Sequence, residues 1–193
     1  VSIQENVNFA QSEAALLRFA REGFDIIIGH GFQFGDPAKK IHKRFPKTWF
    51  IVNTAKVAAA PNLASFDNRW GDAGYVAGAV AASVSKTGTI GHIGGIPVPV
   101  IQEYQEGFER GAKRIRPDIK VLTAVVGSFS DIAKGKEITL SLIERGADVV
   151  TATGNENVVG TIQAAKEKNV MAIGTAFDSA ALAPETIVTT AII

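Results

Sequence analysis

The 193-residue sequence has no cysteine, so disulfide bonds and thiolate metal sites are excluded. It has only three histidines, and these are scattered, so no pair stands at the spacing of a metal site. A net charge of +1 gives no sign of a nucleic-acid partner or of binding to an anionic membrane surface. Long apolar runs are missing too, since none approaches the roughly 20 residues of a membrane span.

The sequence does contain short apolar runs that alternate with helical patterns. The runs are rich in β-branched residues and almost continuously apolar, which predicts strands buried on both faces of a parallel sheet. Strand followed by helix, repeated about six times, predicts an α/β fold with doubly wound sheets and right-handed crossovers. The predicted strands cover residues 25–28, 49–52, 63–66, 89–93, 121–126, 148–151 and 170–173.

Capping residues mark several helix ends. Ser12 and Asp131 are each placed to cap the start of a helix. A further helix opens at Asn155 or Asn157, and Asn169 is placed for a left-handed stop at its end. These signals predict helices on the segments between the strands.

Residues 57–74 and 187–193 interrupt the rhythm of strand and helix, and both are interpreted as crossings between two lobes. The predicted division is an incomplete N-terminal lobe at 1–66, a C-terminal lobe at 67–186 and a crossing back toward the first lobe at 187–193.

Ligands of open α/β sheets bind beyond the carboxyl ends of the strands. The residues at these ends are mainly aromatic rings, amides and hydroxyls, with few carboxylates, a set that suits a flat ring or a sugar. Rings can stack on the ligand face, amides can address its edge, and a carboxylate can accept from ribose hydroxyls. The candidate ligand-binding residues are Phe32, Phe34, Asn53, Phe129, Asn155 and Asp178.

Structural alternatives stay open for most of these residues. Each phenylalanine could instead plug the core beneath its loop, and Asn53 could end its strand in a turn. His30 is interpreted as a polar rim group rather than a catalytic base. Asp178 follows a strand with no helical pattern close behind that needs a cap, which favours a functional role.

Enzyme motifs fit poorly. Gly29 and Gly31 follow a strand as in a dinucleotide fingerprint, but the third glycine, Gly35, stands one place too far along. Asn53 also occupies the position where an acidic residue is wanted. With no phosphate-binding loop, serine elbow or metal spacing, we expect no catalytic residue, no cofactor and no metal.

Several segments together resemble the basic membrane protein family, the purine-nucleoside-binding lipoproteins of bacterial ABC transport systems. The resemblance implies a type I periplasmic-binding-protein fold, in which two lobes joined by a hinge hold the ligand between them. It implies that a purine stacks between Phe32 or Phe34 of one lobe and Phe129 of the other, with the asparagines and Asp178 at its edges. The segments are residues 23–32, 61–65, 86–101, 107–111, 127–136, 146–150 and 181–184.

The resemblance further implies a solute-binding component of an ABC importer, which delivers a purine nucleoside or nucleobase to a membrane permease. It would work at the periplasmic or extracellular face of the membrane, held by a lipid anchor outside this sequence. A ligand-sensing module of a regulator or receptor with the same fold is the alternative.

The sequence also departs from the family pattern. The family's first strand and the C-terminal part of the first lobe are not in this sequence, and residues 1–7 are expected to form the family's second strand. Many relatives read Gly-Val-Asp-Ser-Asp where residues 174–178 read Gly-Thr-Ala-Phe-Asp. The loss of one carboxylate makes a free base or another small molecule a plausible ligand.

Overall fold

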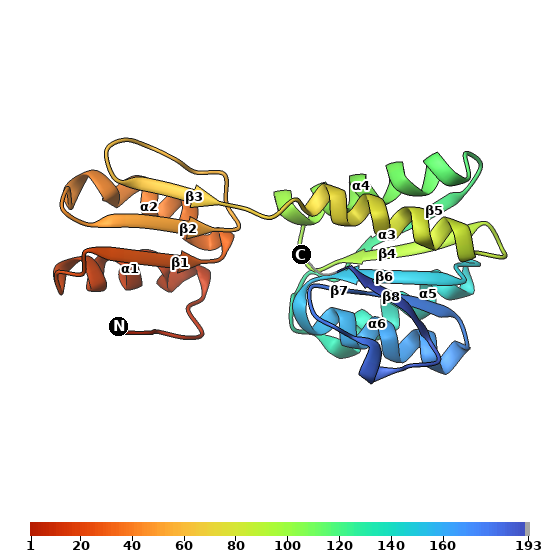
Figure 1. Ribbon diagram of the computed structural model, residues 1–193. Coiled ribbons are helices and arrows are strands. Elements are labelled where there is room, and N and C mark those ends of the chain that lie inside the picture. The colour runs from red at the N-terminus through yellow and green to blue at the C-terminus, as the bar shows by residue number, and fades with distance from the viewer. Residues whose placement is uncertain (192–193) are drawn as a thin grey trace. The chain divides into compact units, whose positions relative to one another are not determined.

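The computed structural model describes residues 1–191 and divides the chain into two units, Val1–Asn68 and Arg69–Ile193 (Figure 1). The boundary between Asn68 and Arg69 lies close to the predicted lobe boundary after residue 66. Residues 187–191 form the last strand of the second unit. The crossing proposed for 187–193 stays a prediction, and its residues 192 and 193 lie outside the described residues.

Unit 1 is a small parallel sheet with helices on one face (Figure 1). Its strands lie in the order β1-β2-β3, and Ile28 of β1 is in register with Ile51 of β2. The strands are β1 (Ile26–His30), β2 (Trp49–Asn53) and β3 (Leu63–Phe66). The helices are α1 (Ser12–Arg21) and α2 (Gly35–Ile41), with 3-10 turns η1 (Phe9–Gln11), η2 (Phe32–Phe34) and η3 (His42–Arg44).

The prediction that all strands are buried on both faces is wrong for this sheet. Ile27 and Phe50 face the helices and are buried, whereas Ile28 is 63% exposed and Trp49 50% exposed on the opposite face. The reason is that the described helices of unit 1 cover only one face of its sheet. The expectation that residues 1–7 form a strand is also wrong. Residues 1–8 have no strand conformation, and none of the described strands pairs with them.

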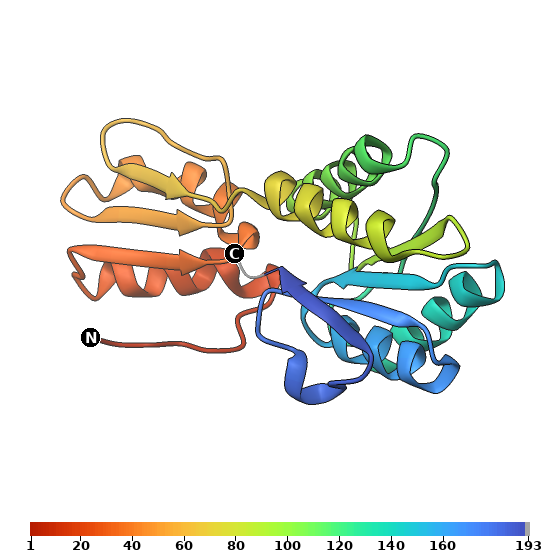
Figure 2. The same cartoon turned by 45° about the vertical axis from the view of Figure 1, so that its right-hand side comes forward.

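Unit 2 is a five-stranded parallel sheet in the order β5-β4-β6-β7-β8. Helices α3 and α4 cover one face and α5 and α6 the other, as both views show (Figures 1 and 2). The predicted doubly wound α/β layout is confirmed here. The strands are β4 (Thr89–Gly94), β5 (Lys120–Val125), β6 (Val149–Thr153), β7 (Met171–Thr175) and β8 (Ile187–Ala191). The helices are α3 (Trp70–Val84), α4 (Pro99–Ile115), α5 (Ile132–Glu144), α6 (Asn155–Lys168) and the 3-10 turn η4 (Ala180–Leu182).

Both core layers of unit 2 follow from the apolar faces of these helices. Leu142 and Ile162 pack from α5 and α6 under one face, and Tyr104 and Phe108 pack from α4 against the other. The five residues of β6 are all buried, as expected for a central strand covered on both faces. No helix within residues 1–191 combines the length and apolar character needed to cross a membrane.

Candidate functional site

At the carboxyl edge of the unit 1 sheet, His30 and Asn53 form a bonded pair. They end neighbouring strands in register, and Asn53 Nδ2 donates to His30 Nδ1 at 2.8 Å. Thr54 Oγ1 donates to Asn53 Oδ1 at 3.2 Å, which fixes the amide from its other side. Because Nδ1 accepts, the imidazole proton is on Nε2, a donor available to an incoming ligand. The rim interpretation of His30 missed this link to Asn53.

The two candidate rings of unit 1 occupy different environments. Phe34 is 8% exposed and packs over Gly29 within the core of unit 1. This is the core-plug alternative that the sequence left open. Phe32 is half-buried, and its ring meets Phe9 edge-on with the centroids 5.1 Å apart. Phe32 is therefore the candidate ring that unit 1 offers at its surface.

In unit 2, Phe129 lies over two glycines at the strand ends. Its ring is so close to Gly95, after β4, that a Cβ there would overlap it. A Cβ on Gly154, after β6, would come within 2.8 Å of the ring carbon Cδ1. The ring is half-buried. It thus extends from the end of β5 across the ends of β4 and β6.

Left-handed backbone accumulates at the same carboxyl ends. Three non-glycine residues adopt positive φ there: Thr54 (62°) after β2, Asn155 (26°) after β6 and Ala176 (67°) after β7. Such conformations cost about 1–3 kcal/mol each and gather at functional sites. Asn155 is also exposed and is the first residue of α6, so its amide is available to a ligand. The strain supports placing the site at these edges.

Asp178 is exposed in the loop after β7. Strand β7 neighbours β6 in the sheet. Its Oδ1 accepts from Ala180 N at 3.0 Å and so stabilises the turn η4. The expectation that nothing behind Asp178 needs a cap is therefore wrong, because a 3-10 turn of three residues carries no periodicity in the sequence. Its Oδ2 has no hydrogen-bond partner within residues 1–191, which leaves one oxygen for a ligand.

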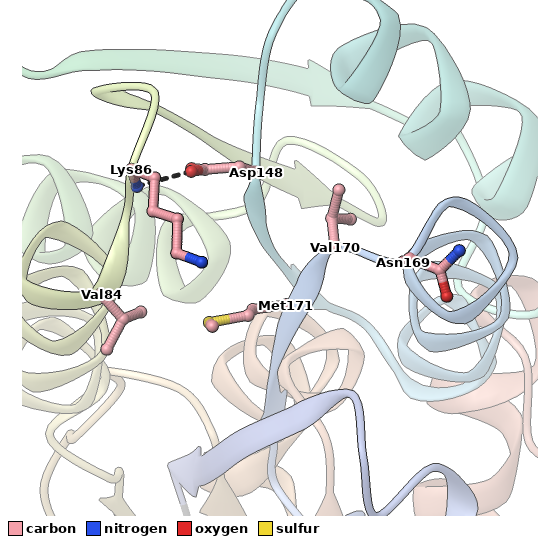
Figure 3. A pocket seen from close by; sticks show the side chains of 6 residues that line it. All are labelled: Val84, Lys86, Asp148, Asn169, Val170 and Met171. Atoms are coloured by element: carbon pink, nitrogen blue, oxygen red, sulfur yellow. Dashed lines mark hydrogen bonds between the residues drawn. The ribbon is translucent and has the colours of Figure 1, made fainter.

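A pocket of about 100 Å³ lies at the opposite edge of the unit 2 sheet (Figure 3). The carboxylate of Asp148 on its wall accepts from Ser85 Oγ and from two backbone amides, so it is a structural group. The pocket is therefore separate from the candidate site. Its lining residues are Val84, Lys86, Asp148, Asn169, Val170 and Met171. Within residues 1–191, no group of three or more His, Cys, Asp or Glu could hold a metal ion.

Two curated relatives of the chain are named for purine or nucleoside binding. The chain is 33% identical over 177 residues to a purine-binding protein of Brucella abortus, covering 92% of this chain and 50% of that protein. It is 34% identical over 149 residues to the ABC transporter nucleoside-binding protein BmpA of Lactococcus lactis, covering 77% of this chain and 42% of the relative. The chain spans about half the length of the curated relatives it matches.

Solved structures agree on the fold. An ABC transporter solute-binding protein of Aeropyrum pernix superposes with a TM-score of 0.87 at 24% identity, over 95% of this chain and 55% of that one. A transcriptional activator of the comK gene from Bacillus halodurans superposes with a TM-score of 0.78 at 29% identity, over 95% of this chain and 63% of that one. The family model for Bmp, the PnrA-like ABC transporter substrate-binding proteins, matches residues 2–193. The chain therefore belongs to the Bmp family of PnrA-like ABC transporter substrate-binding proteins.

Proposed function

We propose that the protein captures a purine nucleoside or nucleobase and delivers it to the permease of an ABC importer. The observation that carries this proposal is the ring of Phe129, laid over Gly95 and Gly154 at the carboxyl edge of unit 2. A ring fixed in this way offers a flat apolar face, which is what a purine stacks on. The relatives named for purine and nucleoside binding support the same ligand class.

The polar groups around that ring suit the edges of the ligand. The amide of Asn155 can both donate to and accept from the edge of a base. The carboxylate of Asp178 can accept from ribose hydroxyls through charge-assisted hydrogen bonds. In unit 1, Phe32, Asn53 and His30 supply a ring and a polar pair of the same chemical kind.

The proposed action is binding without bond cleavage. Capture and release need only contacts that favour the ligand-bound state over the empty one. The relatives are substrate-binding proteins, which supports a role outside catalysis. In this proposal the protein works on the outer side of the cell membrane, and a lipid anchor beyond this sequence holds it there.

Isothermal titration calorimetry with adenosine, inosine, guanosine and their free bases tests the proposal on the protein as the cell makes it. We expect micromolar or tighter binding of at least one of them, and its loss in Phe129→Ala and in Asp178→Ala. Lys39→Ala, an exposed change on α2, is the control that should bind normally. If none of these compounds binds, the ligand assignment is wrong. Release of free base during incubation would instead indicate a hydrolase.

The second candidate is a ligand-sensing module with the same fold. It is favoured by the likeness to the comK activator, at 29% identity over 95% of this chain. Capture of a purine would be the same in both roles. Co-purification of an ABC permease with the liganded protein supports transport, whereas ligand-dependent control of a promoter supports sensing.

A further inference from the structure

The loop that carries Phe129 is held by the first turn of α6. Ser128 O accepts from Asn157 Nδ2 at 2.7 Å, and Phe129 O accepts from Glu156 N at 3.2 Å. Two consecutive carbonyls of the loop are thus bonded to two consecutive residues of the helix. On its other side, Gly127 N donates to Gly95 O at 2.7 Å, which anchors the start of the loop to the β4 end.

The side chain of Asn157 is fully buried, with none of its surface exposed. Its Nδ2 bonds the loop, but its Oδ1 has no hydrogen-bond partner within residues 1–191. A buried amide that leaves an acceptor unsatisfied costs free energy that an apolar residue of similar size would avoid. Packing alone therefore does not explain an asparagine at this position, whereas the bond to Ser128 does.

The amide of Asn157 also lies between two glycines. A Cβ on Gly154 would come 3.2 Å from Nδ2, and a Cβ on Gly135 would come 3.3 Å from Oδ1. Gly154 is the same glycine whose missing Cβ makes room for the ring of Phe129. In space, the glycine therefore lies between the ring of Phe129 and the amide of Asn157. A displaced amide would displace the loop that carries the ring.

We propose that Asn157 is a positioning residue that sets how far the Phe129 ring lies over Gly95 and Gly154. It acts through Ser128 O and does not itself touch the ligand. The inference rests on the proposed function, because the position of the ring determines the face on which the purine stacks. It adds to that function a specificity element, the distance between the Phe129 ring and the Asn155 amide at the start of the same helix.

The test reads the position of the ring directly, with 4-fluorophenylalanine at position 129 and fluorine NMR of the ligand-free protein. Asn157→Leu keeps the volume of the side chain and removes the donor, so we expect the fluorine resonance to move or broaden. Calorimetry with inosine should show at least tenfold weaker binding. The matched control is Thr161→Val, about one turn beyond Asn157 on α6, which removes a buried hydrogen bond to Thr139 of α5 (3.0 Å). It should leave the resonance and the affinity unchanged.

An unchanged resonance in folded Asn157→Leu overturns the positioning role, whatever the affinity. If that variant does not fold, the smaller and polar Asn157→Ser replaces it, because its hydroxyl is too short to span to Ser128 O, and the same shift is expected. If no purine binds even the unsubstituted protein, the proposed function fails. The fluorine signal of the ligand-free protein then still decides whether Asn157 positions Phe129.

Discussion

Asn53 Nδ2 donates to His30 Nδ1 at 2.8 Å, joining the last residues of two neighbouring parallel strands. The bond orients both side chains at the edge where unit 1 is proposed to meet its ligand. Each residue holds the other in place, so the pair should behave as one element of the site.

Substitution of this pair should weaken ligand binding without unfolding the protein. We expect His30→Ala and Asn53→Ala each to lower the affinity for a purine nucleoside about tenfold, the equivalent of roughly one hydrogen bond. The double variant should bind about as weakly as either single variant, because the first change already releases the second residue. Calorimetry on all four proteins measures this coupling, and strictly additive losses would contradict it.

Asn62 is a buried asparagine of unit 1 that bonds several backbone carbonyls. It is 2% exposed, and its Nδ2 lies within hydrogen-bond distance of the carbonyls of His42, Phe45 and Thr48, at 2.9, 2.8 and 2.6 Å. Its Oδ1 is 3.0 Å from His42 Nδ1. The residue thus ties the start of β3 to the segment before β2.

Asn62→Leu should destabilise unit 1 by about 2–4 kcal/mol, since it removes the bonds to all three carbonyls and leaves the Thr48 carbonyl without a donor. Trp49, in β2, reports the unfolding of this unit by fluorescence in a urea titration. Asn8→Ala, which changes an exposed asparagine at the turn η1, is the control and should shift the midpoint little. A midpoint for Asn62→Leu equal to that of the control would show that the bridge is not stabilising.

Local signals in the sequence were sufficient for some elements and not for others. Asp131 was predicted as a cap, and its Oδ1 accepts from Lys134 N at 2.9 Å. Asn169 was predicted as a left-handed stop, and its φ is 54°. Ser12 was not the cap of α1, because the helix follows directly on η1 and the Ser12 hydroxyl donates to Phe9 O instead. Caps depend on neighbours in the sequence, which is why pattern reasoning reaches them.

The features that were missed depend on residues distant in the sequence. The bare face of the unit 1 sheet was not foreseen, because an apolar strand has the same pattern whether one or both faces are covered. Asn157 was considered only as a helix opener, since its bond to Ser128 joins positions 29 residues apart. Phe32 and Phe34 have the same pattern in the sequence, and only the packing over Gly29 separates them.

His92 should make unit 2 sensitive to acid. It is fully buried on β4, where its Nε2 lies 2.9 Å from Thr153 Oγ1, and burial lowers the pKa of the imidazole from 6.5 to about 3. Below about pH 6.5, His92 of the unfolded chain therefore binds a proton that the buried imidazole of the folded chain does not bind. The stability should be fully present above pH 6.5 and fall by about 1.4 kcal/mol per pH unit toward pH 3.

Removal of the imidazole should flatten this dependence. Urea titrations of His92→Leu between pH 7 and pH 4 give the free energy of unfolding at each pH. Its slope against pH should be shallower than in the parent protein by the contribution of one proton. Tyr104→Phe, which alters the ring stacked on His92 at 5.5 Å but keeps the imidazole, should retain the full slope. Equal slopes in the parent protein and in His92→Leu would place the source of acid sensitivity elsewhere.

Asp148 should give a second pH dependence at lower pH. Burial tends to raise the pKa of its carboxyl, but the Ser85 hydroxyl and the amides of Thr87 and Lys86 donate to it at 2.6, 2.8 and 2.6 Å. Together these bonds hold the pKa below its ordinary value of 3.8. A lowered pKa in the folded state adds stability above the unfolded pKa, and that stability is lost as the pH falls through the folded pKa.

Asp148→Asn should therefore lower the stability at pH 7 by about 1 kcal/mol, a modest value because water screens a carboxylate that is only partly buried. The difference from the parent should shrink as the pH falls below 4, where the parent carboxyl also becomes neutral. Urea midpoints at pH 7, 5 and 3 measure it, and Asp118→Asn, which loses only an exposed ion pair with Arg116, serves as the control. A stability difference that stays constant from pH 7 to pH 3 would mean that Asp148 acts through its shape, because the charge that accepts from Ser85, Lys86 and Thr87 would then make no contribution.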